Sequence, residues 1–171
     1  MSDTEIVDIV DEQGNVIGNR VRSECHRNKS LIHPAVHFTL YDAKTKRVLM
    51  TKRSTTKKFD GGKSCFLGEH VLSGESLTDA VARGFQEELG FEGEEFHELD
   101  THIFRFESQT EYTKFYIALW KGEELHPDRN ESEKEWWMNF DELRMLNENV
   151  GDITRFWIEK IDWNILENKF S

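Results

Sequence analysis

The sequence has few of the residues that mark several protein classes. It contains two prolines and two cysteines, and Cys25 and Cys65 form no CxxC pair, so neither a disulfide framework nor a cysteine-based zinc site is predicted. No apolar run approaches the ~20 residues needed to span a bilayer. The first residues also lack a basic segment followed by an apolar one. We therefore expect a protein of the reducing cytoplasm that has no membrane partner.

Positive charge is also scarce. The chain has 22 Lys and Arg residues against 33 Asp and Glu, a formal net charge of −11. This balance argues against a nucleic-acid polymer as partner and leaves acidic side chains available to hold cations. With 171 residues, 37% of them hydrophobic, the chain is long enough for one domain spanning 1–171 with a sizeable core.

The hydrophobic pattern places strands on both sides of one central helix. A helix is predicted between Ser76 and Gly90, a short one from Asp141, and a C-terminal one over about 152–168. Alternating or β-branched segments predict strands at 6–10, 16–21, 35–41, 47–53, 101–106, 112–120 and 135–138. This order favours an α/β (α+β) fold with a mixed sheet between helices.

The central helix carries acid on its apolar face. At about 100° per residue, Val81, Phe85 and Glu88 share one stripe, with Glu87 at its margin. A buried carboxylate needs a hydrogen bond, a counter-charge or a metal. The alternative is that both glutamates are solvated and the stripe is shifted by one residue. Gly84, which costs about 1 kcal/mol relative to Ala in a helix, indicates either close approach of another group or simple tolerance.

Residues 69–91 resemble the Nudix box, G-x5-E-x7-R-E-U-x-E-E-x-G-U, in which U is a bulky apolar residue. Two positions differ: Glu69 stands where the first glycine belongs, just after Gly68, and Gly84 stands where the first glutamate of the core belongs. The positions that match are Glu75, Arg83, Phe85, Glu87, Glu88, Gly90 and Phe91.

The resemblance implies a loop–helix–loop that holds a divalent metal, usually Mg²⁺, against a diphosphate. Glu87 and Glu88 match metal-binding positions, and Arg83 matches the arginine that orients neighbouring glutamates, with Glu75 in a supporting position. Carboxylates with phosphate oxygens suit Mg²⁺, which also activates water. Gly84 removes one carboxylate that binds metal or activates water in many hydrolases of the family.

A wider resemblance, over roughly residues 5–145, is to the Nudix branch that includes type I isopentenyl-diphosphate isomerase and its hydrolase relatives. In the isomerase, the positions of three histidines and two glutamates form a metal site; here they are His26, His33, His70, Glu88 and Glu111. Imidazole with carboxylate suits Mn²⁺ or Zn²⁺ as well as Mg²⁺. The isomerase also needs a cysteine at the position of Gly68, whereas Cys65 is three residues away.

Two charged segments flank these motifs. Lys52, Arg53, Lys57 and Lys58 are candidates for binding a diphosphate, and a solvated basic loop is the alternative. Glu131, Glu133 and Glu135 lie in an acidic run from which Nudix hydrolases often draw a water-activating glutamate; the alternative is a solvated surface.

The leading hypothesis is a Nudix-type hydrolase that cleaves a diphosphate linkage in a nucleoside diphosphate derivative or a prenyl diphosphate. Its expected catalytic residues are Glu88, Glu87, Arg83 and Glu111, acting with Mg²⁺ or Mn²⁺, and with Zn²⁺ as a candidate at the histidines. One alternative is an isomerase of the isopentenyl-diphosphate type. Another is a catalytically silent diphosphate-binding domain, suggested by Glu69 and Gly84. The sequence leaves open whether the protein forms a homodimer.

Overall fold

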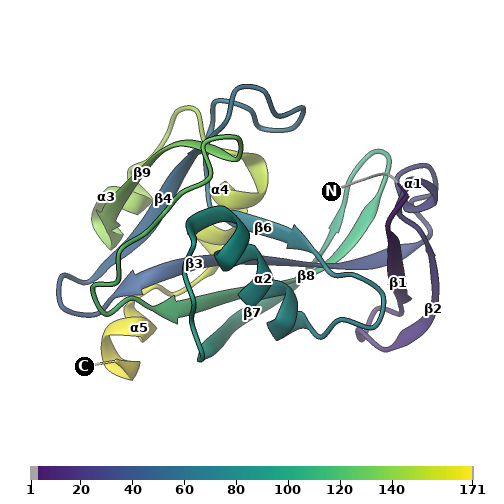
Figure 1. The fold of residues 1–171 in the computed structure, drawn as a ribbon, viewed down its shortest axis with the longest axis horizontal. Helices are drawn as coiled ribbons and strands as arrows, with labels where there is room; N and C mark the ends of the chain where they lie inside the picture. The colour runs from purple at the N-terminus through teal and green to yellow at the C-terminus, as the bar shows by residue number, and fades with distance from the viewer. Residues whose placement is uncertain (1–3, 171) are drawn as a thin grey trace.

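The computed structural model describes residues 4–170, which form nine strands in one mixed sheet together with five helices (Figure 1). The strands are β1 (Ile6–Val10), β2 (Val16–Val21), β3 (Ile32–Asp42), β4 (Arg47–Arg53), β5 (Ser64–Cys65), β6 (Leu67–His70), β7 (Phe96–Arg105), β8 (Thr110–Leu119) and β9 (Ser132–Asn139). The helices are α1 (Arg22–Cys25), α2 (Leu77–Leu89), α3 (Phe140–Arg144), α4 (Asp152–Lys160) and α5 (Asn164–Lys169).

Strand β3 is the centre of the sheet. It pairs antiparallel with β1, β4 and β6, and parallel with β8. Strand β8 continues to β7, and β4 continues to β5 and β9. Segments from the first, middle and last thirds of the chain therefore meet along one long strand.

Alternation along β3 and β8 builds a core on each face of the sheet. Phe38 and Tyr116 pack with Phe85 of α2, whereas Phe115 packs on the opposite face with Trp157 of α4. Neighbouring residues of a strand point to opposite faces, so each strand contributes side chains to both cores. Helix α2 lies in front of the sheet and α4 behind it (Figure 1). The expected mixed sheet between helices is confirmed.

Helix α2 begins and ends where the sequence predicts. The Ser76 hydroxyl accepts a hydrogen bond from the backbone N–H of Asp79 (3.1 Å), which satisfies one free donor of the first turn. Gly90 ends the helix in the left-handed region, with φ +61°. These caps fix the start and the end of the segment that carries the two glutamates.

The single helix expected over 152–168 is instead two helices. Ile161 is extended (ψ 129°) and ends α4. The break turns Trp163 into the core, where it is fully buried and its indole N–H donates to the backbone oxygen of Ile158 (3.1 Å). Ile165, which would share an apolar stripe with Ile161 on one continuous helix, is 52% exposed. Burying a large aromatic ring outweighs the few helical hydrogen bonds that the break removes.

Candidate functional site

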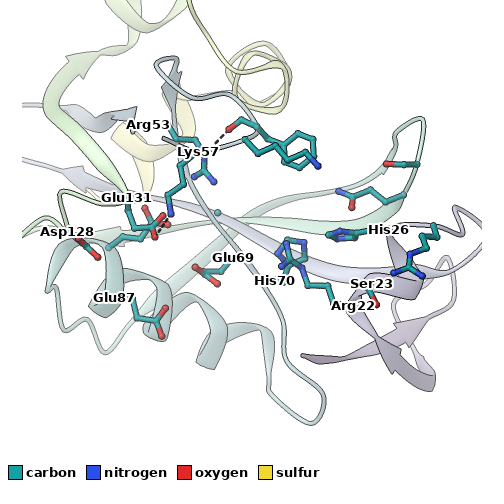
Figure 2. A pocket seen from close by; sticks show the side chains of 17 residues that line it. Arg22, Ser23, His26, Arg53, Lys57, Glu69, His70, Glu87, Asp128 and Glu131 are labelled. Atoms are coloured by element: carbon teal, nitrogen blue, oxygen red, sulfur yellow. Dashed lines mark hydrogen bonds and ion pairs between the residues drawn. The ribbon is translucent and has the colours of Figure 1, made fainter. Parts of the chain in front are cut away.

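One cavity of about 940 Å³ lies between α2, β6, α1 and the loop that follows β4. Figure 2 shows Glu87 and Glu69 on one wall, Arg53 and Lys57 on another, and His26 and His70 at the far end. Acidic and basic side chains thus face the same space. Such an arrangement can hold a cation and an anionic group side by side.

Arg83 joins the loop before α2 to the helix itself. Its Nε and Nη2 donate to both carboxylate oxygens of Glu75 (2.9 and 3.0 Å), and its Nη2 also donates to the backbone oxygen of His70 (2.9 Å). Its Nη1 donates to Oε2 of Glu69 (3.0 Å). Glu75 in turn accepts from the backbone N–H of Leu72 (2.9 Å). This network holds the orientation of the loop and of β6 relative to α2.

Glu88 is buried on the inner face of α2. The residue is 5% exposed, and among residues 4–170 its carboxylate makes no hydrogen bond and no ion pair within 4 Å. Burial, with the neighbouring charges of Glu69 and Glu131, raises the pKa of Glu88 to about 8. The predicted apolar stripe therefore placed Glu88 correctly on the buried face of α2. The alternative that Glu88 is a solvated surface residue is wrong.

Glu87 differs from its neighbour. Its side chain is 58% exposed and lies 3.6 Å from Nη1 of Arg83, and it lines the outer part of the cavity. The helix therefore presents one carboxylate that is buried and one that faces solvent. Both open onto the same cavity.

Three histidines form a compact cluster at the other end. Nitrogen atoms of His26, His33 and His70 lie within 4.8 Å of one another. Oε1 of Glu111 lies 3.9 Å from Nε2 of His33 and 3.7 Å from Nε2 of His70, too far for hydrogen bonds. Within residues 4–170, neither Nε2 atom has a hydrogen-bond partner. Buried, converging nitrogens of this kind fit a metal ion better than they fit one another.

The sheet register assembles this cluster. Parallel pairing of β3 with β8 sets His33 beside Glu111, and antiparallel pairing with β6 sets His70 beside Ala35. Burial lowers the pKa of His33 to about 4, which keeps the imidazole neutral. Burial likewise raises the pKa of Glu111 to about 7. Neutral imidazole is the form that binds metal.

Gln109 completes the Glu111 side of the cluster. Gln109 donates from Nε2 to Oε1 of Glu111 (2.7 Å) and lines the cavity in front of it. The amide positions Glu111 and adds no negative charge.

The four basic residues predicted to bind a diphosphate divide into two groups. Arg53, Lys57 and Lys58 line the cavity. Lys52 is not part of its lining, and its ammonium pairs with Glu133 at 2.7 Å. Adjacent strand residues point to opposite faces, so only one of Lys52 and Arg53 can reach the site. The prediction for Lys52 is not supported by its position.

The acidic run before α3 divides in the same way. Glu131 lines the cavity and pairs with Lys57. Glu133 accepts from Lys52 and Thr55 outside the cavity, and these contacts lower its pKa to about 2. Glu135 is held by Arg129 (2.9 Å). Of the three, only Glu131 stands where it can act on a bound molecule.

Sequence reasoning missed several cavity residues, among them Glu69, Asp128 and Arg22. Glu69 stood out only as a departure from the box pattern, although its place next to His70 on one short strand was a usable signal. Asp128 reaches the cavity because its backbone N–H donates to the backbone oxygen of Glu88 (2.9 Å). Arg22 comes from α1 and had no sequence signal.

The geometry defines a class: an α+β domain in which a loop–helix–loop and a histidine cluster present candidate metal ligands to one cavity with basic side chains. The chain matches the model of the NUDIX domain over residues 31–157. The chain therefore belongs to the NUDIX domain family.

Relatives of two kinds are similar to the chain. The isopentenyl-diphosphate Delta-isomerase of Mycolicibacterium vanbaalenii is 29% identical over 152 residues, which cover 84% of this chain and 82% of that protein. The uncharacterized Nudix hydrolase SCO1686 of Streptomyces coelicolor is 38% identical over 90 residues, covering 52% of this chain and 49% of that protein. The likeness to the isomerase branch is confirmed.

Among solved structures, DR0079 from Deinococcus radiodurans superimposes with a TM-score of 0.76, at 18% identity, over 92% of this chain and 99% of that one. At this identity the likeness concerns the fold. Across residues 4–170, no helix has the length and apolar character needed to cross a membrane.

Proposed function

We propose that the protein is a metal-dependent hydrolase that cleaves a diphosphate linkage in a small molecule, either a nucleoside diphosphate derivative or a prenyl diphosphate. The observation that carries the proposal is Glu88, a buried carboxylate that has no partner among residues 4–170 and opens onto a cavity lined by Arg53, Lys57 and Lys58. A divalent cation would satisfy Glu88, and the basic residues would satisfy the phosphates that share the cation.

Each side chain then has a definite task. Glu88 and Glu87 hold the cation, and a bound divalent cation supplies charge neutralisation and activates water. Arg83 keeps the helix and the preceding loop in register through Glu75. Arg53 is positioned by its own donation from Nε to the backbone oxygen of Phe59 (3.0 Å), which leaves its terminal nitrogens to bind phosphate. Lys57 is held near the same space by Glu131.

The test is release of phosphate or a monophosphate from a panel of nucleoside diphosphate derivatives and prenyl diphosphates, with Mg²⁺, Mn²⁺ or Zn²⁺ added. We expect turnover that requires added metal and falls at least about 100-fold in Glu88→Gln, a size typical of lost electrostatic stabilisation. Glu167→Gln is the matched control. Glu167 lies in α5, pairs with Lys46 (2.7 Å) and is not part of the cavity lining. Equal rates for wild type and Glu88→Gln across the panel would exclude the proposal.

The histidine cluster favours a second candidate, an isomerase acting on an isopentenyl-type diphosphate. The isomerase-like candidate requires imidazoles and a carboxylate in one cluster. The residues that form such a cluster here are His26, His33, His70 and Glu111. Deuterium incorporation from heavy water into isopentenyl diphosphate, without release of phosphate, would support it.

The position of the missing cysteine argues against this candidate. A Cβ at Gly68 would lie 2.7 Å from Cδ2 of His37, whose Nδ1 accepts from the indole of Trp157 (2.8 Å). Cys65 does not substitute, because it is buried away from the cavity lining and burial raises the pKa of its thiol to about 11. We therefore expect no deuterium exchange. Metal-dependent binding of a diphosphate without either reaction would instead indicate a silent binding domain.

A further inference from the structure

The two departures from the box pattern meet in space. Glu69 comes from β6 and Gly84 from α2, yet a Cβ built at Gly84 would lie 2.8 Å from Cγ of Glu69. It would also lie 2.4 Å from Cζ of Phe38, a fully buried ring. Carbon atoms do not pack this closely. The helix therefore has no room for a side chain at position 84 while Glu69 and Phe38 occupy their places.

The carboxylate of Glu69 is held at the wall of the cavity. Its Oε2 accepts from Nη1 of Arg83 (3.0 Å), and its side chain is 12% exposed. From residues 4–170, Oε1 receives no hydrogen bond. Figure 2 shows Glu69 between Glu87 and His70, in the part of the cavity where the acidic wall meets the histidines.

Glu88 lines the same cavity and is the second observation. It is buried and lacks a hydrogen-bonding or ion-pairing partner within the described chain, and Glu69 lines the same cavity with a side chain that is 12% exposed. Two carboxylates with so little exposure to water repel each other in one cavity unless a cation is shared between them.

We propose that Glu69 is a metal ligand that replaces the carboxylate absent at position 84, and that Glu69 and Glu88 share one divalent cation. The carboxylate ligand comes from strand β6 instead of helix α2. The absence of a side chain at Gly84 leaves the room that the side chain of Glu69 needs. The site thereby keeps a carboxylate that the box pattern alone counts as lost. This inference deepens the proposed function and rests on it.

Mn²⁺ binding, measured by electron paramagnetic resonance on the full chain, tests the inference without an assay of activity. The histidine cluster is first filled with one equivalent of Zn²⁺, so that the titration reports the carboxylate site. Glu69→Gln keeps the shape of the side chain and its contact with Gly84 but removes the charge. We expect it to weaken Mn²⁺ binding at least about tenfold, as Glu88→Gln does, whereas Glu167→Gln binds like wild type.

A second variant separates direct ligation from an effect through Arg83. In Glu69→Cys a thiolate replaces the carboxylate on a side chain that is shorter by two bonds, and thiolates favour soft cations such as Cd²⁺. We expect weaker binding of Mn²⁺ together with a thiolate-to-Cd²⁺ charge-transfer absorption in the ultraviolet. Wild type, whose Cys25 and Cys65 are buried, and the surface variant Glu167→Cys should lack that absorption.

The outcomes distinguish the inference from the proposed function. If Glu69→Gln binds Mn²⁺ within twofold of wild type while Glu88→Gln does not, Glu69 is no ligand and the hydrolase proposal stands. The same conclusion follows if Glu69→Cys gives no Cd²⁺ absorption and binds Mn²⁺ like wild type. If Glu88→Gln also binds like wild type, both the inference and the proposed metal site are wrong. Circular dichroism and thermal unfolding of each variant establish that the titrated protein is folded.

Discussion

The ring of Phe38 closes the space beside Gly84: a Cβ at position 84 would lie 2.4 Å from Cζ of Phe38. Phe38 cannot move aside easily, because it is fully buried and its ring centroid lies 4.6 Å from that of Phe85. Gly84 is therefore required by packing. Simple tolerance of glycine, the alternative that the sequence left open, does not describe this position.

We expect Gly84→Ala to destabilise the protein by about 1–3 kcal/mol through overpacking, although alanine alone would favour a helix by about 1 kcal/mol. Urea unfolding measures the change. Gly18→Ala is the control, since a Cβ there meets nothing within 4 Å and the residue lies on the exposed strand β2. A Gly84→Ala variant as stable as wild type would contradict the packing account.

Arg83 donates hydrogen bonds to three residues, so the geometry of its guanidinium group should matter as well as its charge. We expect Arg83→Lys to cost about 1.5–3 kcal/mol, because an ammonium cannot reproduce the bidentate contact with Glu75 and the bond to Glu69 together. Denaturant unfolding checks this. Arg144→Lys, at an exposed pair with Asp141 (3.3 Å), should change stability little. Similar losses in both variants would show that the network adds nothing to an ordinary ion pair.

Glu88 should make the metal-free protein less stable as the pH rises. Its pKa is about 8 when folded, against an ordinary value of 4.5, so between these values the folded state holds a proton that the unfolded state has released. Stability from the neutral carboxyl is complete below pH ~4.5 and is lost as pH rises through ~8. With EDTA present, Glu88→Gln should gain about 2 kcal/mol or more relative to wild type between pH 5 and pH 9.

Urea unfolding at a series of pH values measures this gain. Mn²⁺ should abolish it, because bound metal stabilises the ionised wild-type carboxylate and has less to bind in Glu88→Gln. Glu167→Gln should follow wild type over the whole range. A constant difference between Glu88→Gln and wild type from pH 5 to pH 9 would mean that Glu88 ionises normally in the folded protein.

The histidine cluster should bind a transition metal independently of the carboxylates of α2. We expect wild type to bind one Zn²⁺ at this cluster and His70→Ala to bind it more than about 100-fold more weakly, since a direct ligand matters more than the 10–100-fold of a supporting residue. Calorimetric titration gives both affinities. His102→Gln is the control, because His102 packs on Phe156 (4.2 Å between ring centroids) outside the cluster.

A further variant tests the role of Glu111 in that cluster. Glu111→Gln should weaken Zn²⁺ binding less than His70→Ala does if the three imidazoles supply most of the affinity. An equal loss in both variants would make Glu111 a full ligand. Unchanged affinity in His70→Ala would exclude the cluster as a metal site.

Much of the fold could be predicted because its signals are local. Ser76 and Gly90 fix the ends of α2 through their own backbone and side-chain chemistry, and the apolar stripe correctly placed Glu88 on the buried face. The C-terminal segment shows the limit of such patterns. The spacing of Ile161 and Ile165 satisfies a helical period, but the core needed Trp163, and the helix breaks to supply it.

The order of amino acids is enough to identify the chemical groups of the site: the box glutamates, the three histidines and the basic segment after β4. Tertiary structure decided which of them share a space. The parallel pairing of β3 with β8 sets His33 beside Glu111, strand alternation turns Lys52 away from Arg53, and the packing of α2 on β6 sets Gly84 against Glu69. These relations join residues distant in the chain, and no local periodicity encodes them.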